Sequence, residues 1–113
     1  MIILRNPYEL FELFSVDPRH QGAIDFSELC YRLNAAELGL ELPDMGSMGG
    51  IIRFMMRERR VSAKLFYSRM KAALRPMLEA DEATLEALGL RPERRTSTAM
   101  AVAVAAWMVA ADE

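Results

Sequence analysis

A chain of 113 residues is short enough to form one domain and long enough to bury an independent core. Hydrophobic residues make up 52% of it and charged residues 27%, a balance typical of a globular protein rather than of a disordered one. The formal net charge of −2 disfavours a nucleic-acid partner, which normally requires a basic face. We therefore expect a single globular domain over residues 1–113 that binds no nucleic acid.

The first two helices are predicted from caps and apolar spacing. Asn6 and Pro7 suit the N-terminal end of a helix, and Pro18 ends that helix near Val16 or Asp17. Apolar residues at helical spacing then predict a second helix that begins near Asp25 or Ser27 and runs to about Leu38, with Gly39 as its C-terminal cap.

The remaining chain continues the helical pattern after a glycine-rich and proline-containing loop over Leu40–Gly50. Three of the later helices are expected at Ile51–Arg59, from Ser62 to a break near Pro76, and at about Met77–Leu88 before Gly89. A last helix is capped by Ser97 or Thr98 and runs through Trp107. No useful stretch alternates with period two, so no sheet is predicted.

The segment between the first two helices follows the residue pattern of a calcium-binding loop. Counted from Asp17, the first, sixth, eighth, ninth and twelfth positions are Asp17, Gly22, Ile24, Asp25 and Glu28. Carboxylates at the first and last positions hold the ion from opposite sides, and the sixth position requires a glycine for a sharp turn. The segment resembles an EF-hand loop on these residues.

The resemblance implies a tight loop over 17–26 with Gly22 at positive φ, and a ligand set of Asp17, the Ala23 carbonyl, Asp25 and Glu28. Ligand positions three and five carry Arg19 and Gln21 instead of the usual oxygen ligands. We expect no calcium at cellular concentrations, or only weakly bound calcium, with Arg19 pairing with Asp25 or Glu28. An ordinary helix–turn–helix that matches the pattern by chance is the alternative.

EF-hands usually occur in pairs, and Ile51–Lys71 lies where a second hand is expected. Its loop, Met56–Arg60, offers Glu58 as the only acidic side chain and no glycine, so it should not bind calcium. The chain is thus similar to degenerate EF-hand-like pairs of the calmodulin type or of voltage-gated cation channels, which act as protein-binding modules. The implied fold is all-α, with an EF-hand-like pair over 6–74 and two additional helices in the C-terminal extension over 75–113.

No arrangement typical of an active site is present. His20 has no second histidine or cysteine beside it, and Cys30 falls on the apolar side of a predicted helix. No glycine-rich phosphate-binding loop and no Ser/His/Asp set accompany the carboxylates. We expect a protein that is not an enzyme, with no catalytic residues and no cofactor beyond weakly bound calcium.

Other charged and apolar groups have less specific interpretations. One cysteine cannot form an intramolecular disulfide, and the apolar run Ala99–Ala111 is shorter than the roughly 20 residues that span a bilayer, so a cytoplasmic chain with no membrane span is expected. A basic mid-section is interpreted as a solvated face; it consists of Arg53, Arg57, Arg59, Arg60 and Lys64.

Methionine and the C-terminal segment suggest a protein partner. Nine methionines, several near the middle of the chain, suit either an irregular core or an adaptable groove. The helix around Ala99–Val109 is apolar nearly all round and must be buried, in cis or, as we favour, in trans against a partner or a second copy. The candidate partner-binding residues are Met55, Met56, Phe66, Met70, Val102, Trp107 and Met108.

These patterns predict a non-enzymatic regulatory, adaptor or structural subunit that binds an apolar or amphipathic helix of a larger protein. Two alternatives stay open. One is a weak Ca²⁺-sensing EF-hand protein, and the other is a helical accessory subunit of a multiprotein or membrane-associated complex without EF-hand ancestry.

Overall fold

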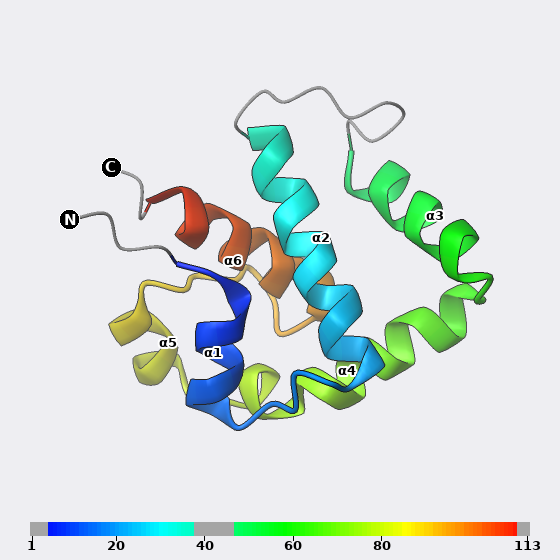
Figure 1. Cartoon of the computed structure of the whole chain (residues 1–113). Helices are drawn as coiled ribbons and strands as arrows, with labels where there is room; N and C mark the ends of the chain where they lie inside the picture. Colours follow the sequence, from blue (N-terminus) through cyan, green and yellow to red (C-terminus); the bar gives the residue numbers. More distant parts are fainter. Residues whose placement is uncertain (1–4, 38–46, 111–113) are drawn as a thin grey trace.

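A computed structural model describes residues 5–37 and 47–110, and these residues form six α-helices and no strand (Figure 1). The helices are α1 (Pro7–Phe14), α2 (Gln21–Glu37), α3 (Met48–Arg59), α4 (Ala63–Leu78), α5 (Glu82–Leu88) and α6 (Ser97–Ala110). The predicted all-helical fold is confirmed. No helix within the described ranges is both long and apolar enough to cross a bilayer.

Helix α2 runs through the middle of the molecule and contacts four others (Figure 1). It packs most extensively on α4 and α6, which also touch each other. Helix α3 lies at the edge of the molecule, where its packing partner is chiefly α2 (Figure 1). The position of α3 relative to the other helices therefore depends mainly on its contacts with α2.

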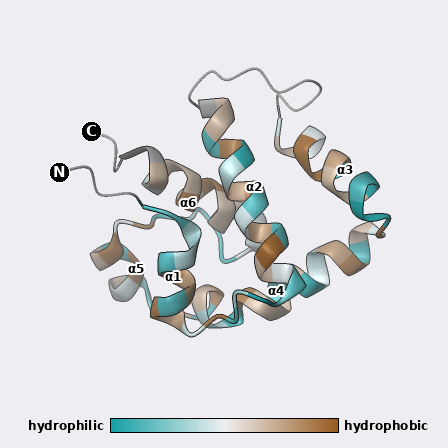
Figure 2. Cartoon of the chain, in the orientation of Figure 1, coloured by the Kyte–Doolittle hydropathy of each residue, from teal (hydrophilic) through white to brown (hydrophobic). Residues whose placement is uncertain are grey.

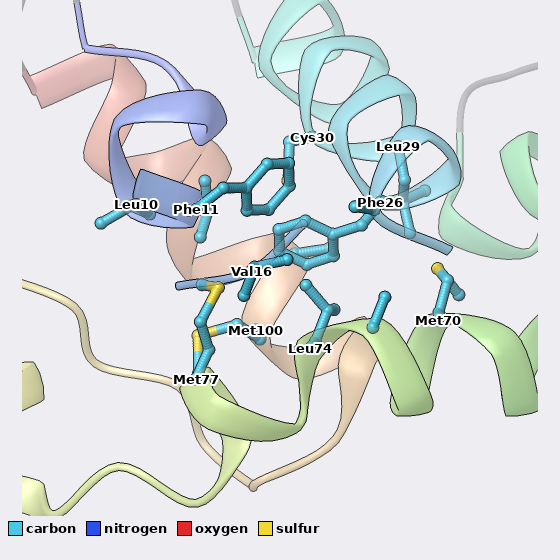
Figure 3. Close-up of a cluster of buried hydrophobic side chains, with 14 of the residues drawn as sticks. Leu10, Phe11, Val16, Phe26, Leu29, Cys30, Met70, Leu74, Met77 and Met100 are labelled. Atoms are coloured by element: carbon cyan, nitrogen blue, oxygen red, sulfur yellow. The ribbon is translucent and has the colours of Figure 1, made fainter. Parts of the chain in front are cut away.

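One hydrophobic core draws side chains from all six helices. Phe11 of α1 and Phe26 of α2 meet at its centre, with ring centroids 6.0 Å apart. Leu74 and Met77 of α4 approach them from the other side, as Figure 3 shows. Burial of such large side chains contributes roughly 1.5–3 kcal/mol each, so this cluster is the main source of stability.

Helix α6 is docked on its own chain. It has no strongly hydrophilic residue along its length (Figure 2), and Met100, Val104 and Trp107 are buried in the shared core. The expected docking of this segment in trans is therefore corrected to docking in cis. Its outer side still presents Val102, which is 54% exposed.

Several predicted helix ends are confirmed by their capping geometry. The Asn6 side chain accepts a hydrogen bond from the Glu9 amide, and Ser62 caps α4 in the same way. Gly89 adopts φ 79° after α5, a left-handed conformation that suits glycine. These ends follow from local chemistry, which is why sequence alone locates them.

Other predicted boundaries are wrong. Helix α4 does not break near Pro76 but continues to Leu78, because a proline in the last turn interrupts few backbone hydrogen bonds and the extra turn buries Met77 and Leu78. Helix α3 ends at Arg59 as predicted, but it begins at Met48 rather than Ile51 and includes most of Met56–Arg60, the loop of the predicted second hand. The predicted end of the second helix at Leu38 and Gly39 lies outside the described residues.

Candidate functional site

The connection between α1 and α2 is shorter than the predicted calcium loop. Ser15, at φ 58°, ends α1, and the Asp17 side chain then accepts a hydrogen bond from the Arg19 amide at 2.9 Å. This hydrogen bond also lowers the pKa of Asp17. Helix α2 begins at Gln21, so the tight loop expected over 17–26 is wrong, and so is the start of α2 at Asp25 or Ser27.

Gly22 has a different role from the one predicted. It lies inside α2, and the one glycine with positive φ in the described part of the chain is Gly89. A Cβ atom on Gly22 would lie 2.0 Å from the backbone carbonyl oxygen of Arg69 in α4. The glycine therefore allows close packing of α2 against α4 rather than a turn.

Asp25 lies in α2 beside this close approach, and its side chain is 0% exposed. Its two carboxylate oxygens accept hydrogen bonds from two arginines: Oδ1 from Nε of Arg59 at 2.6 Å and Oδ2 from Nε of Arg69 at 2.7 Å. Gln21 donates a further hydrogen bond to Oδ1 at 2.9 Å. A buried carboxylate needs such complete pairing, because an unpaired buried charge is strongly destabilising.

Glu28 extends the network by one helical turn. Arg59 contacts both of its carboxylate oxygens, with Nη2–Oε1 at 3.1 Å, and Arg32 donates from Nε at 3.2 Å. Partial burial raises the pKa of Glu28, but the hydrogen bonds and charges of Arg59 and Arg32 outweigh it and hold this pKa below its ordinary value. Arg59, at the end of α3, thus connects two acidic residues of α2.

The predicted calcium ligands are not gathered around one point. Asp17 pairs with its neighbour Arg19 on the surface, and the expected pairing of Arg19 with Asp25 or Glu28 is wrong. Ala23 is buried within α2. Within residues 5–37 and 47–110, no group of three or more His, Cys, Asp and Glu side chains is arranged to hold a metal ion.

Sequence reasoning missed Arg59 and Arg69 as the partners of Asp25. They lie 34 and 44 residues away from it along the chain, so no local spacing relates them. Arg59 was assigned to a solvated basic face, although its side chain is only 18% exposed. The usable signal was the position of Asp25 between apolar Ile24 and Phe26, since a carboxylate buried with such neighbours requires a cationic partner.

Most of the predicted partner-binding residues belong to the core. Met55, Phe66, Met70, Trp107 and Met108 are buried. Met56 is half-buried and Val102 is exposed, so these two reach the surface. Binding through the predicted set would thus involve Met56 and Val102 directly.

An apolar groove borders Val102. It lies between the C-terminal half of α2, the start of α3 and α6, and has a volume of about 420 Å³. Its lining residues are Leu33, Ala36, Ser47, Met48, Ile51, Val102, Ala105 and Ala106. We call this the α2–α3–α6 groove; it has no charged residue in its lining.

Cys30 is buried next to the aromatic core, and this burial raises the pKa of its thiol well above the ordinary value (Figure 3). A thiol in this position is mostly protonated at neutral pH and is a poor nucleophile.

Comparison of the chain with known protein families, curated proteins and solved structures finds no match.

Proposed function

We propose that this chain is a non-enzymatic adaptor or structural subunit that binds an amphipathic or apolar helix of a larger protein in the α2–α3–α6 groove. The observation that supports the proposal is the apolar lining of this groove together with Val102, whose side chain is 54% exposed at its edge. Val102 lies on a helix with no polar face, so a partner would cover surface that water solvates poorly.

The lining residues suit a helix as the occupant. Ala36 and Ala106 are small and exposed, so they permit a partner backbone to approach, while half-buried Leu33 offers a larger apolar surface. Met48, at the start of α3, can adopt several rotamers and adapt to different partner side chains. A helix that presents apolar residues at i, i+3 and i+7 would fill such a groove.

Contacts within the chain join two walls of the proposed groove. The Asp25 network joins α2 to α3 and α4 through arginines, and the Arg32 guanidinium lies 4.8 Å from the ring centroid of Phe54 in α3. Both contacts are made by side chains of this chain, so the proposal assigns no ion a role in holding α2 against α3. We therefore propose a permanently formed binding surface rather than one opened by calcium.

A second part of the proposal concerns ancestry. Helices α1–α2 and α3–α4 form two consecutive helix–turn–helix units, and the loop pattern from Asp17 to Glu28 supports descent from a degenerate EF-hand pair. The start of α2 at Gln21 speaks against it, because the second half of the pattern lies in a helix. Binding in the groove does not depend on this ancestry.

Site-specific photo-crosslinking tests the function. Benzoylphenylalanine replaces Val102 in the groove or, as the control, Leu65, which is 49% exposed on α4 and does not line the groove. We expect irradiation in cells to join position 102, and not position 65, to one other protein through a helical segment. The same partner should be lost from a Val102→Glu variant and retained by Leu65→Glu.

Two results would contradict the proposed function. Adducts that form equally at both positions would show that the groove has no specific occupant. Adducts at position 102 that contain a second copy of this chain would assign the groove to self-association through α6.

A further inference from the structure

A second surface on α3 carries three arginines around a hollow. Arg53, Arg57 and Arg60 line it together with Met56 and Val61, and its volume is about 720 Å³. We call this the arginine hollow. Its lining shares no residue with the α2–α3–α6 groove, and the helical repeat places Arg53 and Arg57 on the side of α3 away from Ile51.

The apolar floor of the hollow results from how α3 ends. Arg60 adopts a left-handed conformation at φ 53°, its amide bonds to the Arg57 carbonyl, and the Val61 amide then bonds to the Met56 carbonyl at 3.2 Å. This hydrogen-bond pattern folds the chain back and brings the residue after the helix against the last turn. Met56 and Val61 are consequently neighbours, with arginines on either side.

The three guanidinium groups have no anionic partner within the described part of the chain. Arg53, Arg57 and Arg60 are exposed and take part in no ion pair there, in contrast to Arg59, which is held by Asp25 and Glu28. Arg53 and Arg57 are four residues apart on one helix face, a spacing at which like charges repel each other. An anionic ligand would relieve this repulsion and accept several charge-assisted hydrogen bonds.

We propose that the arginine hollow binds an acidic segment of a partner protein, with an apolar side chain on Met56 and Val61 and carboxylates on the arginines. Met56 and Val61 are half-buried between the arginines and do not project as bilayer-inserting side chains do, which favours a protein segment over a lipid surface. The apolar floor also favours a protein segment over a nucleic-acid backbone, whose phosphates offer no apolar group to Met56 and Val61. This inference goes beyond the groove proposed above and does not require it.

Selection from a phage-displayed library of short random peptides tests the proposal with the full chain as bait. We expect the retained peptides to be enriched in Asp and Glu around one Leu, Phe or Met. The variant R53Q/R57Q/R60Q should bind a synthetic peptide from this group about tenfold more weakly or worse, because several hydrogen bonds between charged groups are lost. Added salt should weaken binding to the unmodified chain.

A matched control removes the same charge elsewhere. The variant R75Q/R91Q/R94Q also loses three exposed arginines, none of which lines the hollow, and it should bind the peptide like the unmodified chain. Thermal unfolding followed by circular dichroism establishes that both variants are folded. If the triple variant in the hollow fails to fold, R57Q alone is used and should still weaken binding severalfold.

Three results would overturn the inference. The retained peptides could lack acidic enrichment, or acidic peptides could bind both triple variants equally. A short single-stranded oligonucleotide or phosphatidylserine vesicles could also bind through the same arginines more tightly than the peptides do. The groove is tested separately with V102E. One outcome would separate the two proposals: the unmodified chain selects apolar peptides that V102E no longer binds, and it selects no acidic peptides. This outcome would support the proposed function and reject the arginine hollow.

Discussion

Gly22 of α2 and Arg69 of α4 are in such close contact that a methyl group on Gly22 would overlap the Arg69 carbonyl oxygen, at 2.0 Å. This contact fixes the distance between the two helices at the point where Asp25 follows Gly22 by about one turn. The side chain of Arg69 then reaches the Asp25 carboxylate at 2.7 Å. The missing side chain of Gly22 and the buried ion pair are thus parts of one arrangement.

Gly22→Ala should therefore be destabilising although alanine is the better helix former. The added Cβ meets backbone atoms of α4, which cannot move aside without separating the helices, and we expect a loss of roughly 1–3 kcal/mol. Gly49→Ala is the matched control, since its nearest neighbour is the flexible Arg53 side chain at 3.2 Å. Chemical denaturation should show that G49A is as stable as the unmodified chain or up to about 1 kcal/mol more stable. Equal effects of the two substitutions would contradict the close packing of Gly22 against α4.

Removing the Asp25 carboxylate should be among the most damaging single changes in the chain. Asp25→Ala leaves Arg69 without its acidic partner and Arg59 with only Glu28, and breaking a buried pair in this way costs about 3–5 kcal/mol. Denaturant unfolding measures the loss. Asp17→Asn is the control: its exposed side chain can still accept the Arg19 amide hydrogen bond, so the unfolding midpoint should move far less than in D25A. A D25A midpoint close to that of the unmodified chain would show that the network contributes no stability.

Stability should fall in mildly acidic solution partly through Glu28. Because Arg59 and Arg32 lower the pKa of Glu28 in the folded chain, its contribution is present above the ordinary value of 4.5 and is lost as pH falls through the lower folded pKa. Thermal unfolding measured across this range should show a decrease in Tm. Glu28→Gln should make the decrease in Tm smaller. It should not abolish the decrease, because Asp17 and Asp81, whose pKa values are also lowered, remain in the variant. A Tm profile of E28Q identical to that of the unmodified chain would exclude a contribution of Glu28.

Calcium should bind no tighter than the millimolar range, if it binds. Both oxygens of Asp25 are engaged by guanidinium groups, which a cation would have to displace, and Arg19 places a further positive charge in the loop. Isothermal titration with calcium chloride measures this directly. The variant R19D/Q21D removes the cation in the loop and should gain affinity only if the loop can rearrange as an EF-hand. A micromolar Kd for the unmodified chain would refute the expectation.

Core positions on α6 should be sensitive and groove positions tolerant. Met100 is fully buried, so Met100→Ala should cost about 2–5 kcal/mol, while Val102→Ala should stay within about 0.5 kcal/mol. Urea denaturation of the two variants gives the comparison. Deleting Ala99–Glu113 should unfold the chain outright. A truncated chain that stays folded would restore the interpretation of α6 as an element that docks in trans.

The parts of the fold that sequence predicts correctly are those decided by neighbouring residues. Asn6, Ser62 and Gly89 act on backbone groups within one turn, so their roles can be inferred without tertiary structure. The apolar character of α6 likewise predicts burial. The apolar character does not identify the surface that covers α6, because docking in cis depends on the contacts that α2 and α4 provide.

The candidate site escaped prediction because its residues have two compatible interpretations. Gly22, Asp25 and Glu28 match loop positions of an EF-hand and also match one face of a helix, and local sequence does not separate the two. The deciding contacts come from Arg59 and Arg69, far along the chain. Arg53, Arg57 and Arg60 are exposed, as predicted for a solvated face, whereas Arg59 of the same predicted face is largely buried.

The pairing of Asp25 also bears on how the chain loses its structure. Since Arg59 belongs to α3 and Arg69 to α4, release of either helix would leave a buried carboxylate with one cationic partner fewer. Partial opening at this point is therefore costly, and α2, α3 and α4 should separate in one cooperative step. In native-state hydrogen exchange, the amides of these three helices should share one opening free energy, whereas short α1 and α5 can fray independently.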